Sequence, residues 1–363
     1  MVGGGAERVT LNLIRYLARN YDYPVDLVLV EASGEFMKQV PDNVRVIDFQ
    51  ASRTLTSMPK LIRYLRNERP HVLLSGMDYV NCVALASVKL AGTGTRTVAC
   101  LHINMSAQLT NYHTWRGRFI TPFVKLTHPW ADVIVGTSIG CGEDFINVTG
   151  VGKKNMEYIY NPAITDDIKP KSLEPVDHRW FLDGGPPVIL AVGRLAHQKN
   201  FELLITAFAK LRKSHDARLL IIGDDGGERS QLEELVMKLG IKDQVDMPGF
   251  ISNPYAYMAK AAMYVLSSRY EALPAVLIEA MYCGTQLIST DCPSGPSEIL
   301  ANGKYGQLVP MDDSDAMASA MMKALQNKNF TQDTSACLPF IDHNVVDQYL
   351  QVLLGSAYTG PTK

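Results

Sequence analysis

The sequence lacks any apolar run near the roughly 18 residues that a membrane-spanning helix needs. Its formal net charge is only -2, from 35 Lys and Arg against 37 Asp and Glu, so no basic excess favours nucleic acid. It begins with glycines and has no charged, then apolar, segment typical of a secretion signal. These absences favour a cytoplasmic protein that neither spans a membrane nor binds nucleic acid.

Cysteine is scarce, and its spacing suggests neither disulfides nor zinc. No Cys-x-x-Cys pair occurs, and most of the six cysteines lie in or beside apolar segments: Cys82, Cys100, Cys141, Cys283, Cys292 and Cys337. We predict that they are reduced core residues. Asp313 and Asp315 match the Asp-x-Asp pattern with which some nucleotide-sugar enzymes hold a divalent metal, but an expected helix at 316–325 follows them, so helix capping explains them. We predict no metal and no cofactor.

Short apolar segments alternate with helical patterns along the chain. The strand candidates are 25–30, 71–75, 97–101, 133–135, 158–160, 188–192, 219–222, 263–266 and 287–289. This alternation is typical of parallel sheets in an α/β protein. Because 363 residues exceed what a single core usually supports, the sequence predicts two Rossmann-like, doubly wound domains that face a central cleft.

A proline-rich stretch at 161–187 separates the two sets of strand candidates, and its composition suits an exposed linker. We place an N-terminal domain at 1–165 and a C-terminal domain at 166–340. Apolar residues at helical spacing within 341–363 predict a terminal helix that packs back on the N-terminal domain. Such folds bind ligands beyond the carboxyl ends of their strands, so we expect the site on strand-to-helix loops.

Two carboxylates, Glu271 and Glu279, flank a predicted turn from the strand at 263–266 into a helix. Pro274 suits the first turn of that helix, and Gly284 suits its end. The backbone N–H groups between the glutamates would lie at a helix N-terminus, which favours an anion, while the carboxylates can accept hydrogen bonds from hydroxyls. A ligand with both phosphate and many hydroxyls fits this pattern best.

Arg194 and Lys199 lie on the loop after the expected strand at 188–192. Two cations five residues apart could neutralise a pyrophosphate as it leaves, without a metal. Taken alone, the loop is better explained as a solvated basic turn. Together with the two glutamates it indicates a functional site, because motifs in a consistent structural context support one another.

Two weaker motifs have competing explanations. Gly4 and Gly5 open an expected helix with an apolar stripe at 9–17, and its first amides could approach a phosphate or a sugar. A glycine run at a chain start also suits a disordered tail. His102 ends the strand at 97–101, where it could be a structural hydrogen-bonding residue or a site residue.

Two apolar features also leave alternatives open. Phe250 and Ile251 follow a short strand and could pack against a nucleobase or fill the core. The segment from Trp115 to Trp130 is basic, aromatic and amphipathic. It could lie on a membrane surface near a lipid-linked acceptor, or it could be an ordinary surface helix that packs its aromatic face inward.

Taken together, Gly4 and Gly5, His102, the Arg194–Lys199 loop and the Glu271–Glu279 pair resemble the signature of the GT4 family of retaining glycosyltransferases, which have the GT-B fold. The set occurs in the family's order and covers almost the whole chain. The resemblance implies transfer of a sugar from a nucleotide sugar to a glycan, lipid-linked or small-molecule acceptor, with retention at the anomeric carbon and UDP as the commonest donor nucleotide. Residues 294–298 are most similar to members that build bacterial surface polysaccharides or lipid-linked oligosaccharides, which act at the inner face of the membrane.

The resemblance also implies a role for each domain and each motif. The domain at 1–165 would bind the acceptor, and the domain at 166–340 would bind the nucleotide sugar. Arg194 and Lys199 would bind the diphosphate, and Glu279 would bind the ribose. Glu271 and the residues after it would hold the donor sugar, with His102 near the reacting face, and the Gly4-Gly5 loop would close over the donor. The candidate donor-binding residues are Gly4, Gly5, Arg194, Lys199, Phe250, Ile251, Glu271, Ala272, Leu273, Pro274 and Glu279.

Two positions depart from the family pattern. Members have an apolar strand directly before the Gly-Gly loop, whereas only Met1 and Val2 precede it here, so we expect the N-terminal sheet to lack its first strand. Ala272 stands where glycine is common. A nucleotide-sugar epimerase and a non-catalytic nucleotide-sugar-binding subunit are the alternative functions. A dehydrogenase is disfavoured because no Gly-x-Gly-x-x-Gly follows a strand.

Overall fold

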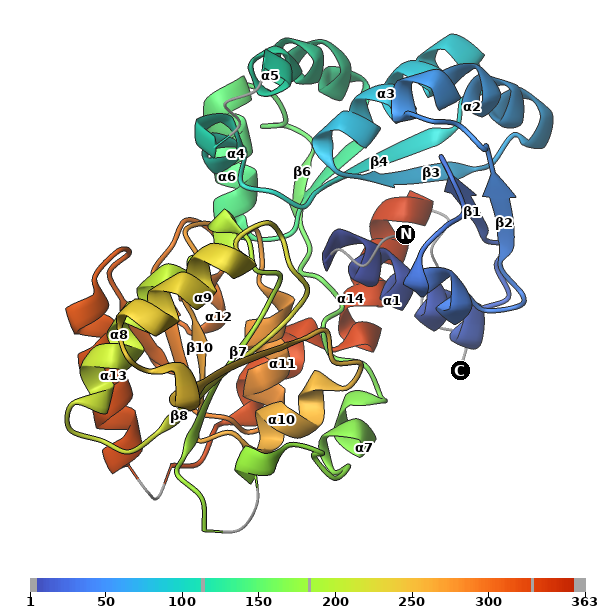
Figure 1. The fold of residues 1–363 in the computed structure, drawn as a ribbon. Coiled ribbons are helices and arrows are strands. Elements are labelled where there is room, and N and C mark those ends of the chain that lie inside the picture. The colour runs from blue at the N-terminus through green and yellow to red at the C-terminus, as the bar shows by residue number, and fades with distance from the viewer. Residues whose placement is uncertain (1–4, 112–114, 182–183, 328–329, 356–363) are drawn as a thin grey trace. The chain divides into compact units, whose positions relative to one another are not determined.

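The computed structural model describes residues 5–111, 115–181, 184–327 and 330–355. The chain divides into two compact units (Figure 1). Unit 1 comprises Met1–Ala163 and Pro339–Lys363, and unit 2 comprises Ile164–Leu338. Both units are built from parallel sheets and helices, which confirms the predicted α/β class. Within the described ranges, no helix combines the length and the apolar character that crossing a bilayer requires.

Unit 1 contains two parallel sheets. The larger has the order β3 (Val72–Gly76), β4 (Arg96–Leu101), β5 (Val133–Gly136) and β6 (Met156–Tyr158). The smaller pairs β1 (Asp26–Leu29) with β2 (Arg45–Asp48). Three β4 side chains in a row are buried, Val98, Ala99 and Cys100, because helices cover both faces of this sheet.

Helices α1 (Gly5–Asn20) and α14 (Asp342–Leu354) pack on one face of the larger sheet, where they form a core with Val98 and Cys100. Helices α2 (Thr54–Glu68) and α3 (Asp78–Ala91) pack together, and both contribute to an apolar cluster with Leu73 of β3. Because side chains alternate along a strand, this cluster lies on the opposite face of the sheet. Helix α5 (Trp115–Thr127) packs on α3. The predicted stripe on α1 is confirmed, since its apolar residues are buried: Val9, Leu13, Ile14 and Leu17.

Unit 2 has one six-stranded parallel sheet. Its order is β12 (Gln307–Val309), β11 (Leu287–Thr290), β10 (Met263–Leu266), β7 (Val188–Val192), β8 (Arg218–Ile222) and β9 (Val245–Gly249). One face packs on α8 (Phe201–Arg212), α9 (Arg229–Lys238) and α13 (Ser314–Gln326). On the other face, α10 (Pro254–Lys260) and α11 (Ala275–Tyr282) lie against β7, β10 and β11 (Figure 1). The sheet is thus doubly wound, as predicted.

The proline-rich stretch at 161–187 is not simply an exposed linker, and that prediction was wrong. It contains α7 (Ile168–Ser172), in which Ile168 is fully buried. Helix α7 packs on α10, so prolines and charges here surround a short packed element. All six cysteines are free, and five of them are buried, as predicted. Asp313 caps α13 by accepting hydrogen bonds from the backbone N–H groups of Asp315 and Ala316, which confirms the capping explanation.

Candidate functional site

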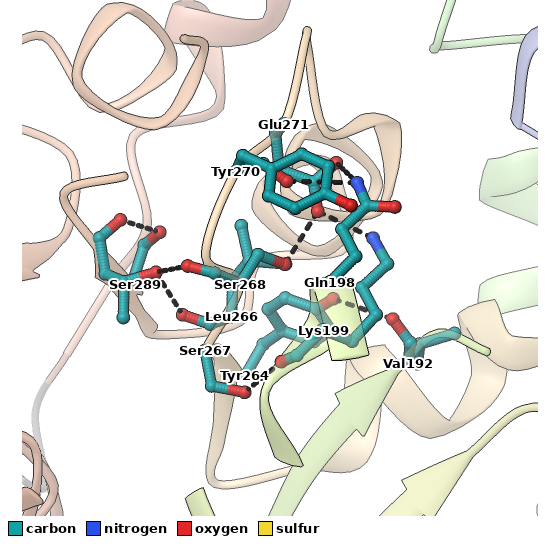
Figure 2. A network of polar contacts seen from close by, with 11 residues as sticks. Val192, Gln198, Lys199, Tyr264, Leu266, Ser267, Ser268, Tyr270, Glu271 and Ser289 are labelled. Carbon is teal, nitrogen blue, oxygen red and sulfur yellow. Dashed lines mark hydrogen bonds and ion pairs between the residues drawn. The ribbon is translucent and has the colours of Figure 1, made fainter. Parts of the chain in front are cut away.

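The two strongest motifs lie on loops that leave adjacent strands of unit 2. Strands β7 and β10 are parallel neighbours, with Ile189 opposite Met263 and Leu190 opposite Tyr264. Because parallel neighbours end at the same edge of a sheet, the loop after β7 and the loop after β10 emerge together. Their side chains converge in Figure 2.

Glycines shape the loop after β7. Gly193 has no side chain, and the Lys199 stem crosses it so closely that a Cβ at Gly193 would lie 3.2 Å from Lys199 Cε. A Cβ at Gly223, on the loop after β8, would lie 2.0 Å from the carbonyl oxygen of Gly193. Only glycine therefore fits at Gly223, whose φ is 155°. The lack of a side chain at Gly193 leaves room for the Lys199 stem, whose ammonium reaches the loop after β10.

Lys199 and Glu271 form an ion pair across the two loops. Lys199 Nζ lies 2.6 Å from Glu271 Oε1, and the two side chains are 18% and 9% exposed. Ser268 Oγ also donates to Glu271 Oε1, at 2.6 Å. Gln198 Nε2 lies 3.4 Å from Glu271 Oε2 and donates to the carbonyl of Tyr270 at 3.0 Å. The carboxylate is thus surrounded by donors from both loops (Figure 2).

Further hydrogen bonds hold the two loops together. Ser267 Oγ donates to the carbonyl of Lys199 at 2.8 Å. The backbone N–H of Arg269 donates to the carbonyl of Gln198 at 2.8 Å, and the Arg269 guanidinium donates to the carbonyl of His197 at 2.7 Å. Most of these bonds end on backbone atoms, so the relative position of the loops does not depend on one flexible side chain.

Glu279 lies one turn inside α11, as predicted, and is 2% exposed. Tyr255, from α10, donates its hydroxyl hydrogen bond to Glu279 Oε1 at 3.3 Å. Pro274 is the N-cap residue of α11 rather than its first helical residue. Gly284, with φ 86°, follows the C-cap residue, where glycine relieves backbone strain.

The two glutamates make the interior of this region electronegative. Burial, together with the negative charges of Glu271 and Glu279, raises the pKa of Tyr264 well above its usual value. Tyr264 donates to the carbonyl of Val192 at 3.3 Å, so it stays a neutral donor beneath the loops. Burial and Glu271 likewise raise the pKa of Cys292 to about 12, which keeps this thiol protonated and unreactive.

The other candidates of unit 2 lie on the same loops as this pair or on the segment after β9. Ala272 and Leu273 are buried directly after Glu271. Arg194 is exposed, and its stem crosses Gly226, where a Cβ would lie 2.9 Å from Arg194 Cγ. Phe250 is 56% exposed after β9, so it does not fill the core. Ile251, next to it, is half-buried.

The candidates of unit 1 lie at the ends of other elements. His102 follows β4, and its ring lies against Gly76, where a Cβ would come within 2.9 Å of His102 Nε2. Burial lowers the pKa of His102 to about 4, so the imidazole is neutral near pH 7. Gly5 begins α1, whereas Gly4 lies outside the described residues.

Within the Trp115–Trp130 segment, the described side chains settle part of the open question. Phe123 and Leu126 of α5 are 58% and 59% exposed, and Trp130 is also exposed, whereas Val124 is buried. Large apolar groups therefore point outward here, and the inward-facing alternative does not hold for them. The side chains of residues 111–119 lie outside the described set.

Two family models match the chain. Residues 3–167 match the model described as Glycosyltransferase Family 4, and residues 176–336 match the model described as Glycosyl transferases group 1. The chain belongs to the GT4 family of glycosyltransferases. This GT4 enzyme is a hexosyltransferase of the GT-B fold, which confirms the resemblance and sets the epimerase and non-catalytic alternatives aside.

Relatives of this GT4 enzyme are similar over most of its length. The N-acetylgalactosamine-N,N'-diacetylbacillosaminyl-diphospho-undecaprenol 4-alpha-N-acetylgalactosaminyltransferase of Campylobacter jejuni is 29% identical over 337 residues, which cover 89% of this chain and 87% of that protein. The amylovoran biosynthesis glycosyltransferase AmsD of Erwinia amylovora is 27% identical, over 91% of this chain and 90% of the relative.

Solved structures agree on the fold. The lipopolysaccharide outer core galactosyltransferase WaaB superposes with a TM-score of 0.72 at 20% identity, over 97% of this chain and 96% of that chain. Anabaena HepE in complex with UDP superposes with a TM-score of 0.68 at 18% identity, over 96% and 93% of the two chains.

Sequence motifs missed three residues of the site: Gln198, Tyr255 and Ser268. Tyr255 comes from a helix that no motif includes. Gln198 and Ser268 lie inside the motif loops, and a polar side chain one or three residues from a charged one is a weak signal that could have found them. The Gln198 contact with Glu271 depends on β7 and β10 being neighbours, whereas the Ser268 contact lies within the loop after β10.

Proposed function

We propose that this enzyme transfers a sugar from a UDP-sugar to a lipid-linked glycan, with retention at the anomeric carbon. The observation that carries the proposal is the Lys199–Glu271 pair, which presents a cation and a carboxylate side by side at the carboxyl edge of the unit 2 sheet. A diphosphate needs a cation, and a sugar needs acceptors for its hydroxyls. One ligand that carries both groups side by side is a nucleotide sugar.

The proposed reaction breaks the bond between the anomeric carbon and the diphosphate oxygen and forms a bond from the same face to an acceptor hydroxyl. The acceptor proton passes to the departing diphosphate oxygen, so no separate base is needed. Negative charge grows on the diphosphate as the bond breaks, and Lys199 with Arg194 stabilises that change. Glu271 holds the sugar hydroxyls, and Glu279 accepts hydrogen bonds from the ribose.

Two features of similar proteins and one residue of this chain support the donor and acceptor classes. Two Campylobacter jejuni relatives are named as N-acetylgalactosaminyltransferases that act on undecaprenol-linked glycans. Anabaena HepE was crystallised with UDP and with UDP-glucose. In unit 1, His102 is neutral near pH 7 and could accept or donate a hydrogen bond to a sugar without adding charge. We propose no metal, because the two cations neutralise the diphosphate.

We also propose that the exposed apolar groups of α5 touch the inner face of the membrane that holds the acceptor lipid. Phe123, Leu126 and Trp130 are exposed, and Lys125 is exposed among them. Apolar side chains that enter the headgroup region beside a cation are typical of proteins that lie on anionic lipid surfaces.

The melting temperature with UDP, GDP and ADP tests the proposal first. Binding to the folded protein alone stabilises it by about 2.7 kcal/mol at 100 times the dissociation constant. We expect a rise of several degrees with UDP and a smaller one with GDP or ADP. Proton NMR of the product of a transfer reaction then reports the anomeric configuration. No rise with any nucleotide would contradict the donor class, and an inverted product would contradict retention.

A further inference from the structure

Ser268 occupies a position between the sheet and the catalytic carboxylate. It is fully buried, two residues beyond the end of β10. Its Oγ donates to Glu271 Oε1 at 2.6 Å, while its own carbonyl accepts a hydrogen bond from Thr290 Oγ1 at 2.6 Å. Thr290 ends the neighbouring strand β11, so the strand ends fix the Ser268 backbone and hence the place of its hydroxyl.

One oxygen of Glu271 accepts from both Lys199 and Ser268. Each contact to Glu271 Oε1 is 2.6 Å long. The other oxygen, Oε2, has the longer contact of 3.4 Å from Gln198. A carboxylate oxygen can accept about two hydrogen bonds, so Oε1 is saturated and Oε2 keeps capacity for a ligand hydroxyl.

Binding of the nucleotide-sugar donor changes the hydrogen bonds that Glu271 accepts. On the proposed function, the Lys199 ammonium turns toward the diphosphate and its bond to Glu271 weakens. An almost buried carboxylate destabilises the protein when it loses the hydrogen-bond donors around it. Ser268 is neutral, so the diphosphate does not draw it away from Glu271. Its hydrogen bond to Glu271 Oε1 therefore persists and keeps the carboxylate from rotating.

We propose that Ser268 is a positioning residue that fixes Glu271 Oε1 and thereby aims Oε2 at the hydroxyls of the donor sugar. The inference rests on the proposed function and deepens it. Ser268 does not contact the nucleotide in this scheme. Its removal therefore lowers the preference of the enzyme for a nucleotide sugar over the free nucleotide, and leaves the affinity for the nucleotide unchanged.

The test measures dissociation constants by calorimetry for UDP, UDP-N-acetylgalactosamine and UDP-glucose. The variants are Ser268→Ala and Ser268→Cys, the second of which keeps the side-chain volume with a weaker donor. Ser172→Ala is the matched control, since Ser172 is also buried in unit 2 and donates to a backbone carbonyl, that of Lys169 at 2.8 Å. The melting temperature of each variant reports folding.

We expect UDP affinity within about twofold of the unmodified enzyme in all three variants. For Ser268→Ala, the ratio of nucleotide-sugar to UDP affinity falls by about tenfold, the loss expected for one hydrogen bond to a charged group. Ser268→Cys falls between Ser268→Ala and the unmodified enzyme, and Ser172→Ala keeps the ratio.

Two results overturn the inference and leave the proposed function standing. One is an unchanged ratio in a folded Ser268→Ala or Ser268→Cys enzyme. The other is an equal loss of UDP and nucleotide-sugar affinity, which would show a general structural role. If the unmodified enzyme binds neither UDP nor a UDP-sugar, the proposed function fails, and the inference fails with it.

Discussion

Lys199 and Glu271 lie 72 residues apart in the sequence, yet their charged groups are 2.6 Å apart in unit 2. Neither side chain is fully exposed, so screening by solvent is weaker than for a surface pair. A ligand that binds one member of this ion pair must supply a new partner for the other member. The pair therefore favours ligands that bring an anion for the lysine and hydroxyls for the glutamate at the same time.

Replacing Lys199 by alanine should lower turnover by about 100-fold or more, because a cation that meets developing negative charge acts mainly in the transition state. Steady-state transfer of sugar from UDP-N-acetylgalactosamine measures this change, and the melting temperature should change by only a few degrees. Lys210→Ala is the control, since Lys210 is also partly buried in unit 2 and also contacts a carboxylate, that of Asp315 at 2.7 Å. A folded Lys199→Ala enzyme with full turnover would remove Lys199 from the reaction.

Replacing Glu279 by alanine should mainly weaken nucleotide binding, by about tenfold, because on the proposed function the ribose hydroxyls lose a buried carboxylate acceptor. Titration of UDP into both proteins checks the change. Glu279→Gln keeps the shape of the side chain and the acceptor for Tyr255, so it separates loss of charge from loss of packing. Equal UDP affinity in all three proteins would place the ribose elsewhere.

Adding a methyl group at Gly223 should disrupt the loop that holds Lys199. The new Cβ would overlap the carbonyl of Gly193, so we expect Gly223→Ala to lower the free energy of unfolding by about 2 kcal/mol or more. Gly227→Ala is the matched control, because Gly227 also has positive φ but no heavy atom within 4 Å of a new Cβ, and backbone strain of about 1 kcal/mol is its only cost. Urea unfolding of both variants measures the difference. Similar losses would mean that the contact between the loops is not tight.

The stability of the protein should fall as the pH rises through the range in which Asp78 titrates. Burial, and the charge of Asp144, raise the pKa of Asp78 from 3.8 to about 7 in the folded state. Between these values the folded state holds a proton that the unfolded chain has released, so the contribution is present at low pH and is lost as pH rises toward 7, on the order of 4 kcal/mol in all.

Asp78→Asn should remove this dependence, so its melting temperature relative to the unmodified protein should rise between pH 5 and pH 8. Asp42→Asn, at an exposed position, is the control. A parallel pH dependence in Asp78→Asn and the unmodified protein would assign the effect to other groups.

Membrane contact should depend on the apolar side chains of α5. Phe123→Ser with Leu126→Ser should lower binding to anionic phospholipid vesicles by about tenfold or more, because both side chains lose apolar area that the lipid would cover. Leu173→Ser removes an even more exposed apolar group, from unit 2, and should leave binding unchanged. Sedimentation with vesicles measures how much of each variant is bound. Equal binding by all variants would place any membrane contact elsewhere.

The fold was predictable wherever a strand is buried on both faces. The predicted bounds of β7 and β10 match the structure, because both strands are continuous apolar runs with turn residues after them. Strand β2 was missed because most of its side chains are exposed and show no apolar pattern. Helix α7 was missed because five residues with a central proline do not resemble a helix, and packing on α10 stabilises them instead.

The site was predictable as two motifs but not as one network. Charge and spacing single out Lys199 and Glu271 separately. Their direct contact depends on strand order, because β7 pairs not only with β8, the next strand in the sequence, but also with the more distant β10. The role of Ser268 depends on a hydrogen bond of 2.6 Å, which no single sequence encodes in its composition or periodicity.

Helix α14 comes from the last part of the chain, yet Val345, Val346 and Tyr349 are almost completely buried in the core of unit 1. During synthesis this core cannot close until the ribosome has made all of unit 2. Unit 2, whose segments are continuous from Ile164 to Leu338, can fold first. The segment of unit 1 that precedes unit 2 therefore reaches its final packing only after α14 has been made.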